Sequence, residues 1–100
     1  MRLELESGQV VEDATEQDIR TLVEGEDFAI LSSDPNGYIQ CARTETQDYL
    51  LEYQEGSLQR HYRATSLPIR LDDVVSVLVK YRRGDPSWKS DFVWERVVLR

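Results

Sequence analysis

Polar and hydrophobic residues alternate along much of the chain, in short runs that turn residues separate. A period of two residues is typical of strands that bury one face, and the joining turns contain Asn36-Gly37 and Gly56, which favour positive φ. Short runs with close turns indicate an antiparallel meander rather than parallel strands joined by crossover helices. The runs of the predicted meander are residues 28–32, 38–43, 49–54 and 58–66.

The beginning of the chain predicts one more pair of strands. Leu3 and Leu5 alternate with glutamates, and Ser7-Gly8 then suits a two-residue hairpin turn before Val10-Val11. At the other end of the meander, Leu58, Tyr62 and Ala64 are expected to share one face of the last strand, because their spacing is even.

A first helix is predicted after this hairpin, because the apolar residues there recur three or four positions apart. Thr15 is a suitable N-cap, and Asp18 stands at the third helical position, where it completes a capping box. Gly25 is expected to end the helix.

A second helix is predicted between Asp73 and Gly84, although its valines would also suit a strand. The ends of the segment decide for a helix: Asp72 or Asp73 is the expected N-cap, basic residues occupy the last turn, and Gly84 stops it. Tyr81 lies on the apolar stripe of this helix and is expected in the core.

The chain closes with a short turn and a strand that contain its two tryptophans. Asp85-Pro86 predicts a capped turn that carries Trp88, and residues 92–99 predict a final strand with Trp94 in the core. The position of Trp88 stays open between core and surface, and tryptophan is the commonest hot-spot residue of interfaces. Trp88 is therefore also a candidate for partner binding.

Together these elements predict one α+β domain over residues 1–100, with two helices packed on a mainly antiparallel sheet of a four-strand meander and a terminal strand. A chain of this length buries an ordinary core without disulfides, and its single cysteine, Cys41, suits a reducing compartment. Neither a signal peptide nor a membrane span is recognised, and a cytoplasmic location is expected.

The charge of −7 is distributed unevenly along the chain. Residues 1–55 carry 14 acidic and 3 basic side chains, whereas residues 56–100 carry 5 and 9. This acidic half argues against direct binding of nucleic acid, since phosphate contacts need clustered Lys and Arg. Acids near the end of the first helix oppose the helix dipole, so capping does not explain them, and the acidic segment is a candidate surface for a basic partner. Its acidic residues are Glu12, Asp13, Glu16, Asp18, Glu24, Glu26 and Asp27.

Catalytic and metal-binding patterns are weak in this sequence. Cys41 and His61 could act as nucleophile and base with Asp48 as the orienting acid, but no glycine elbow or signature spacing supports them. One His and one Cys lack the paired spacing of a metal site. We therefore expect no catalytic residues, no metal and no cofactor.

In its size, its order of helix, strands, helix and strand, and in Trp94 followed only by ERVVLR, the chain resembles a family of small acidic immunity proteins of bacterial polymorphic toxin systems. Members of that family stand beside toxins of the nucleic-acid deaminase type. The resemblance implies a non-enzymatic inhibitor that occludes a basic toxin domain. Two alternatives stay open: a binding or scaffold module that forms a homodimer through its sheet edges, and a small enzyme.

Overall fold

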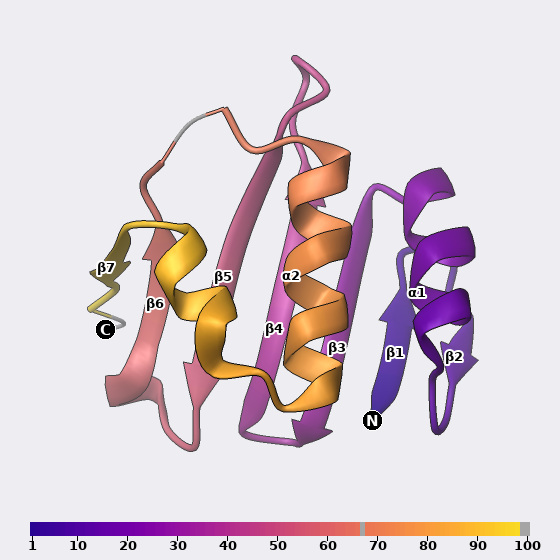
Figure 1. Ribbon diagram of the computed structural model, residues 1–100, viewed down its shortest axis with the longest axis horizontal. Coiled ribbons are helices and arrows are strands. Elements are labelled where there is room, and N and C mark those ends of the chain that lie inside the picture. The colour runs from indigo at the N-terminus through magenta and orange to yellow at the C-terminus, as the bar shows by residue number, and fades with distance from the viewer. Residues whose placement is uncertain (67, 99–100) are drawn as a thin grey trace.

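The computed structural model of the chain describes residues 1–66 and 68–98, which form one antiparallel sheet with helices over one of its faces (Figure 1). The strands are β1 (Arg2–Leu5), β2 (Val10–Val11), β3 (Phe28–Asp34), β4 (Gly37–Arg43), β5 (Tyr49–Glu55), β6 (His61–Ala64) and β7 (Trp94–Arg96). They lie in the order β2-β1-β3-β4-β5-β6-β7, so that β2 and β7 form the two edges. The predicted α+β architecture is confirmed.

The covering helices all lie on the same face of the sheet (Figure 1). The helices are α1 (Glu16–Leu22), α2 (Leu71–Arg83) and the short 3-10 helices η1 (Val23–Gly25), η2 (Leu58–Arg60) and η3 (Pro86–Asp91), of which α1, α2 and η3 form the covering layer. Alternate residues of the strands, such as Leu31, Ile39 and Leu51, are fully buried beneath this layer. The opposite face carries the intervening residues, which are mainly polar. No helix in the described part of the chain combines the length and the apolarity that crossing a membrane requires.

The β1–β2 hairpin differs from the prediction in its loop. The loop has three residues rather than two, because the Leu5 N–H donates to the Gln9 carbonyl (3.0 Å) and the Gly8 N–H to the Leu5 carbonyl (2.9 Å). Gly8 has φ 92°, so it supplies the left-handed residue that three-residue hairpin loops use.

The last strand of the meander is shorter than predicted. Residues 58–60 form η2, and Leu58 is 58% exposed, so Leu58 does not share the strand face of Tyr62 and Ala64. The turn at Gly56, with φ 84°, leads into the 3-10 turn closed by the Arg60 N–H on the Ser57 carbonyl. The final strand is likewise limited to Trp94–Arg96, and its predicted end at residue 99 lies outside the described residues.

The helix ends follow the predicted chemistry, with two corrections. The first is that α1 ends at Leu22 rather than at Gly25, because the 3-10 helix η1 takes up Val23–Gly25. Thr15 and Asp18 form the capping box of α1, and Gly84 ends α2 in the left-handed conformation. The N-cap of α2 is Arg70 rather than an aspartate. Asp73 instead stands at the third helical position, where its carboxylate accepts from the Arg70 N–H at 2.9 Å.

Candidate functional site

The acidic segment lies at the β2 edge of the sheet, where it runs from the end of β2 through α1 and η1 to the start of β3 (Figure 1). Four of its acids are exposed and three are partly buried. The exposed ones are Glu12, Asp13, Glu24 and Asp27, and the partly buried ones are Glu16, Asp18 and Glu26. The segment is continuous along the chain, but its exposed acids lie at the two ends of α1, with Glu12 and Asp13 after β2 and with Glu24 and Asp27 beside Arg43 of β4.

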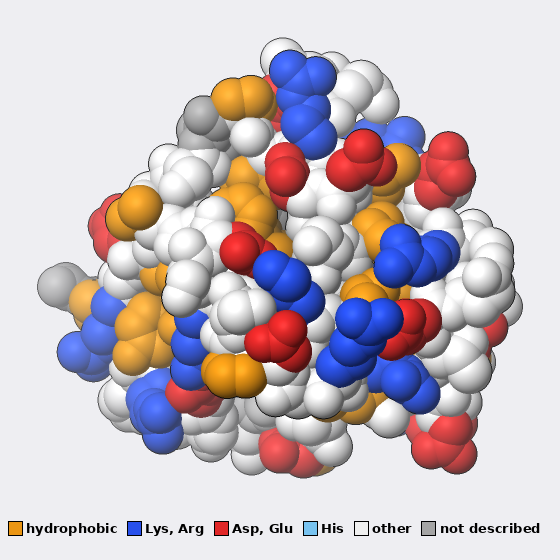
Figure 2. All heavy atoms as spheres, viewed as in Figure 1, with side chains coloured by type: hydrophobic (Ala, Val, Ile, Leu, Met, Phe, Trp, Pro, Cys, Tyr) orange, Lys and Arg blue, Asp and Glu red, His pale blue; other side chains and the backbone are white. Residues whose placement is uncertain are grey.

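Two of the partly buried acids have structural partners of their own. The Thr15 N–H donates to the Asp18 carboxylate, and this hydrogen bond is the main reason why the pKa of Asp18 is lowered. Arg83 of α2 binds Glu16 through two nitrogens, and this contact lowers the pKa of Glu16. Basic and acidic side chains are correspondingly mixed over α1 and α2 on the helix-covered face (Figure 2). On the helix-covered face, neighbouring basic side chains therefore neutralise much of the negative charge of the segment.

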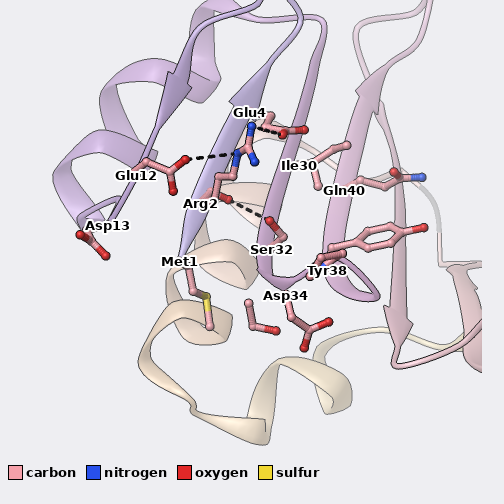
Figure 3. Close-up of a pocket in the computed structure, with 12 residues that line it drawn as sticks. Met1, Arg2, Glu4, Glu12, Asp13, Ile30, Ser32, Asp34, Tyr38 and Gln40 are labelled. Carbon is pink, nitrogen blue, oxygen red and sulfur yellow. Dashed lines mark hydrogen bonds and ion pairs between the residues drawn. The ribbon is translucent and has the colours of Figure 1, made fainter.

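The open face of the sheet has a hollow of about 670 Å³ beside the β2 edge (Figure 3). Its acidic lining residues are Glu4, Glu12, Asp13 and Asp34. Arg2 is the basic residue of the lining, and it pairs with Glu4 (3.0 Å) and Glu12 (3.5 Å). Tyr38 lies on the β4 side of the hollow (Figure 3). The hollow extends the acidic surface from the edge onto the open face.

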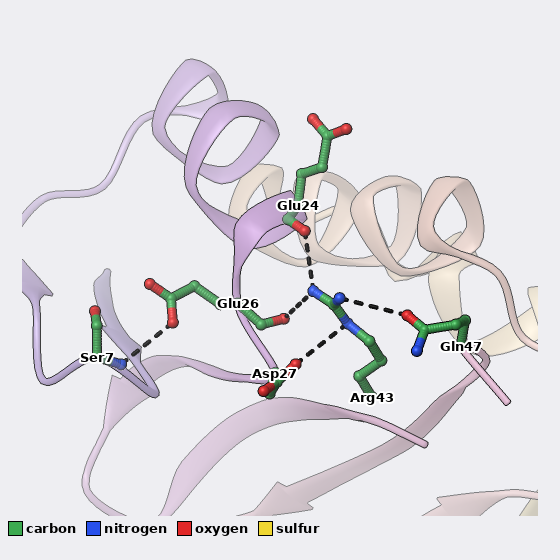
Figure 4. Close-up of polar contacts among 6 residues, drawn as sticks. All are labelled: Ser7, Glu24, Glu26, Asp27, Arg43 and Gln47. Carbon is green, nitrogen blue, oxygen red and sulfur yellow. Dashed lines mark hydrogen bonds and ion pairs between the residues drawn. The ribbon is translucent and has the colours of Figure 1, made fainter. Parts of the chain in front are cut away.

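At the other end of the segment, Arg43 holds the chain between η1 and β3 (Figure 4). Its guanidinium donates to the backbone carbonyls of Glu24 (3.1 Å) and Glu26 (3.0 Å) and pairs with the Asp27 carboxylate at 3.5 Å. The Glu26 carboxylate accepts from the Ser7 N–H at 3.2 Å. The Glu24 side chain points away from this cluster (Figure 4). Glu24 is therefore the acid of this group whose charge is most available to a partner.

Trp88, the remaining candidate for partner binding, belongs to the core. Its side chain is 5% exposed and meets Tyr53, Tyr81 and Trp94 edge-on, with ring centroids 4.8, 5.6 and 5.7 Å away. Trp94 is only partly buried, and its indole N–H donates to the Lys89 carbonyl at 2.9 Å. The 3-10 geometry of η3 turns Trp88 inward over the sheet. Its indole is consequently not presented to a partner.

Cys41 and His61 do not form a catalytic pair. Cys41 lies under the helices, where burial raises the pKa of its thiol to about 12. The register of β4, β5 and β6 places His61 on the open face, since His61 pairs with Gln54 while Cys41 pairs with Leu51. The sheet itself separates the two side chains. Among the described residues, no group of three or more His, Cys, Asp and Glu side chains could hold a metal ion.

A polar cluster around His61 on the open face was not predicted from the sequence. The His61 ring is 5% exposed, and its nitrogens lie 3.1 Å from Gln54 Oε1 and 3.2 Å from Glu52 Oε2. Tyr38 donates to the same Gln54 oxygen (3.2 Å), and Gln40 donates to the same Glu52 oxygen (2.9 Å). Alternation alone marks these positions as facing away from the core, but only the strand register brings them together. Both ring nitrogens are engaged, so the cluster joins β4, β5 and β6 rather than offering a free base.

No protein-family model, no curated protein and no solved structure matches the chain.

Proposed function

We propose that the chain is a non-enzymatic protein-binding domain of the immunity type, which inhibits a bacterial toxin domain by covering its basic substrate groove. The supporting observation is a set of exposed acids at the two ends of α1: Glu12 and Asp13 at the β2 edge, continued by the acidic hollow, and Glu24 and Asp27 beside Arg43 at the start of β3. Complementary charge accelerates association and selects partners, so this surface fits a basic partner.

The likeness to immunity proteins narrows the partner to a toxin that acts on nucleic acid. A deaminase of that kind needs a cationic path for the strand and a pocket for the extruded base. Carboxylates fixed on a folded edge can occupy the positions of phosphates in such a path. The Arg43 contacts to Glu24 and Glu26 order the backbone that carries these carboxylates, which reduces the entropy lost on binding. A reduced, buried Cys41 is compatible with action in the cytoplasm.

The test uses purified basic toxin domains of the deaminase type, including any that is encoded beside this chain. Their activity on single-stranded nucleic acid is measured while the chain is added, and association is followed by stopped flow at low and high salt. Inhibition at one-to-one stoichiometry, with slower association at high salt, is expected. Failure of every such domain to bind or to be inhibited would contradict the proposal.

Glu24→Lys probes the acidic surface directly, because the side chain points away from the Arg43 contacts. We expect this reversal to slow association about 3–10-fold at low salt and to leave the melting temperature nearly unchanged. Glu95→Lys is the matched control, since Glu95 is an exposed acid on β7 at the opposite edge. Equal association rates for the two variants would contradict a role for Glu24 and for the acidic segment that carries it.

A further inference from the structure

His61, the first residue of β6, is the single histidine of the chain, and its ring is buried on the open face of the sheet. Both ring nitrogens face side-chain oxygens of β5: Nδ1 lies 3.1 Å from Gln54 Oε1, and Nε2 lies 3.2 Å from Glu52 Oε2. A neutral imidazole has one N–H and one lone pair, whereas an imidazolium has an N–H at both positions. The protonation of the ring therefore depends on whether each oxygen can only accept.

The Gln54 amide is held in one orientation. Its Nε2 donates to the Asn36 carbonyl at 3.2 Å, which leaves Oε1 toward the His61 ring. Turning the amide over would bring Oε1 against the Asn36 carbonyl, so that two acceptors would face each other. Burial raises the pKa of the Tyr38 phenol, so the hydroxyl stays protonated and donates to the same Oε1 at 3.2 Å. The Gln54 oxygen is consequently an acceptor toward Nδ1.

The Glu52 carboxylate is an acceptor as well. Its side chain is 27% exposed, and its Oε2 also accepts from Gln40 Nε2 at 2.9 Å; water contact and this hydrogen bond both favour the ionised form. An ionised carboxylate has no hydrogen to donate to the ring. A neutral His61 ring would therefore turn its lone pair toward one of the two oxygens. A buried acceptor that faces another acceptor costs free energy, and a second proton on the ring removes this contact.

We propose that the folded chain holds His61 as an imidazolium at neutral pH, paired with Glu52, and that this pair holds β6 on β5 in a pH-dependent way. The neighbouring charges support the second proton. The β5–β6 ladder pairs Glu52 with Arg63, and the β6–β7 ladder pairs Arg63 with Glu95. An imidazolium and a guanidinium then stand beside two carboxylates on the open face, and their formal charges sum to zero. A neutral ring would leave one carboxylate in excess.

Arg60, which precedes His61 in the chain, is paired toward the helix layer. Its guanidinium binds the Glu55 carboxylate at 2.7 Å, and Glu55 also pairs with Lys89 of η3. The charge of Arg60 is thus balanced away from the ring. His61 also reaches the strand beyond β6, because its carbonyl accepts from the Val97 N–H at 2.8 Å. The protonation of His61 therefore affects how firmly both β6 and β7 are held on the meander.

The first experiment reads the protonation of the two ring nitrogens by NMR of the full chain, in which one histidine gives one pair of signals. The measurement is made at about pH 7.5, roughly one unit above the ordinary titration point of histidine near 6.5. Both nitrogens should carry a proton at that pH. A wild-type ring with one unprotonated nitrogen would overturn the proposal, and this test needs no variant.

Glu52→Gln is the matched variant, because it keeps the shape of the side chain and sets an amide N–H against the His61 Nε2. The Gln40 amide can turn over to accept from the new amide, so a neutral ring is then fully hydrogen-bonded. We expect a neutral ring in this variant at about pH 7.5. Glu4→Gln makes the same change in the same row of the open face, on β1, and should keep the imidazolium. Two protonated nitrogens in Glu52→Gln, or a neutral ring in Glu4→Gln, would overturn the pairing with Glu52.

The second experiment follows stability against pH. Above about pH 6.5 the unfolded chain loses the histidine proton and the folded chain keeps it, so the folded state binds one proton more. The stabilisation is therefore complete below about pH 6.5 and is lost as pH rises, by up to about tenfold in the folding equilibrium constant per pH unit.

Urea midpoints of the wild type should accordingly fall between about pH 6.5 and 8, whereas those of Glu52→Gln should stay nearly constant. Burial raises the pKa of the Cys41 thiol to about 12, and this thiol affects both proteins alike. His61→Gln replaces Glu52→Gln if that variant does not fold. Parallel profiles of wild type and variant would overturn the proposal. These measurements involve no partner, so their outcome is independent of the proposed function.

Discussion

Replacing Trp88 with alanine is expected to destabilise the protein more than the same change at Trp94. Trp88 is 5% exposed under three aromatic neighbours, whereas Trp94 is partly exposed on the edge strand. Full burial of an indole removes about 200 Å² from water, worth roughly 5 kcal/mol at ~25 cal/mol/Å². Residual compactness of the unfolded chain reduces this to about 4 kcal/mol, within the range of about 3–5 kcal/mol for tryptophan truncation.

The expected loss at Trp94 is smaller, about 3 kcal/mol, because Trp94 is only partly buried and part of its indole surface stays in contact with water. On a chain of this size, ~4 kcal/mol lowers the melting temperature by roughly 15–30 °C, so the two variants are easily separated. The sequence alone suggested the reverse order, because it placed Trp94 in the core and left Trp88 open between core and surface.

The assay is urea unfolding followed by far-ultraviolet circular dichroism, which does not depend on the fluorescence of the residue that is removed. The slope of free energy against urea should be similar in both variants, because the fold is unchanged. Trp88→Phe serves as the milder variant if Trp88→Ala does not fold. A Trp94→Ala protein that is as unstable as Trp88→Ala, or less stable, would refute this account of the core.

Two further predictions concern local structure. Gly84→Ala should cost about 1 kcal/mol, because Gly84 has φ 73° and no neighbouring atom lies within 4 Å of the added methyl group. Gly25→Ala, in equally open space without positive φ, should instead stabilise the protein by about 0.5 kcal/mol in thermal unfolding. The lowered pKa of Asp18 predicts a stabilising contribution that is present above its ordinary value of 3.8 and is lost as pH falls through the folded pKa. Asp18→Asn should remove that acid dependence from urea midpoints measured between neutral pH and about pH 2, and identical profiles would contradict it.

Local features of the fold could be predicted from the sequence. Residues 49–54 are predicted as a strand of the meander, and β5 spans Tyr49–Glu55. The capping box at Thr15 and the left-handed stop at Gly84 formed as expected. These features depend on neighbouring residues, since capping, turn conformation and side-chain alternation act within a few positions of the chain.

The candidate site also has one part that the sequence shows and another that it does not. The acidic segment is visible in the sequence as a run of like charges, but its partners are not. Arg83 is 67 residues from Glu16, and no local pattern indicates which acids such distant bases neutralise. The burial of the two tryptophans was likewise not predictable from the sequence. Both occupy plausible core positions, and only the packing of η3 against β5 and α2 determines which one is buried.

The sequence by itself determined the α+β class, the main strands and helices and the concentration of acids in the first half of the chain. The tertiary structure decided the strand order, in which β1 lies between β2 and β3, and thereby which segments became the two edges. It also placed Cys41 and His61 on opposite faces and assembled the polar cluster of β4, β5 and β6. The physical reason is that local geometry is encoded within a few residues, whereas burial and pairing depend on segments that only folding brings into contact.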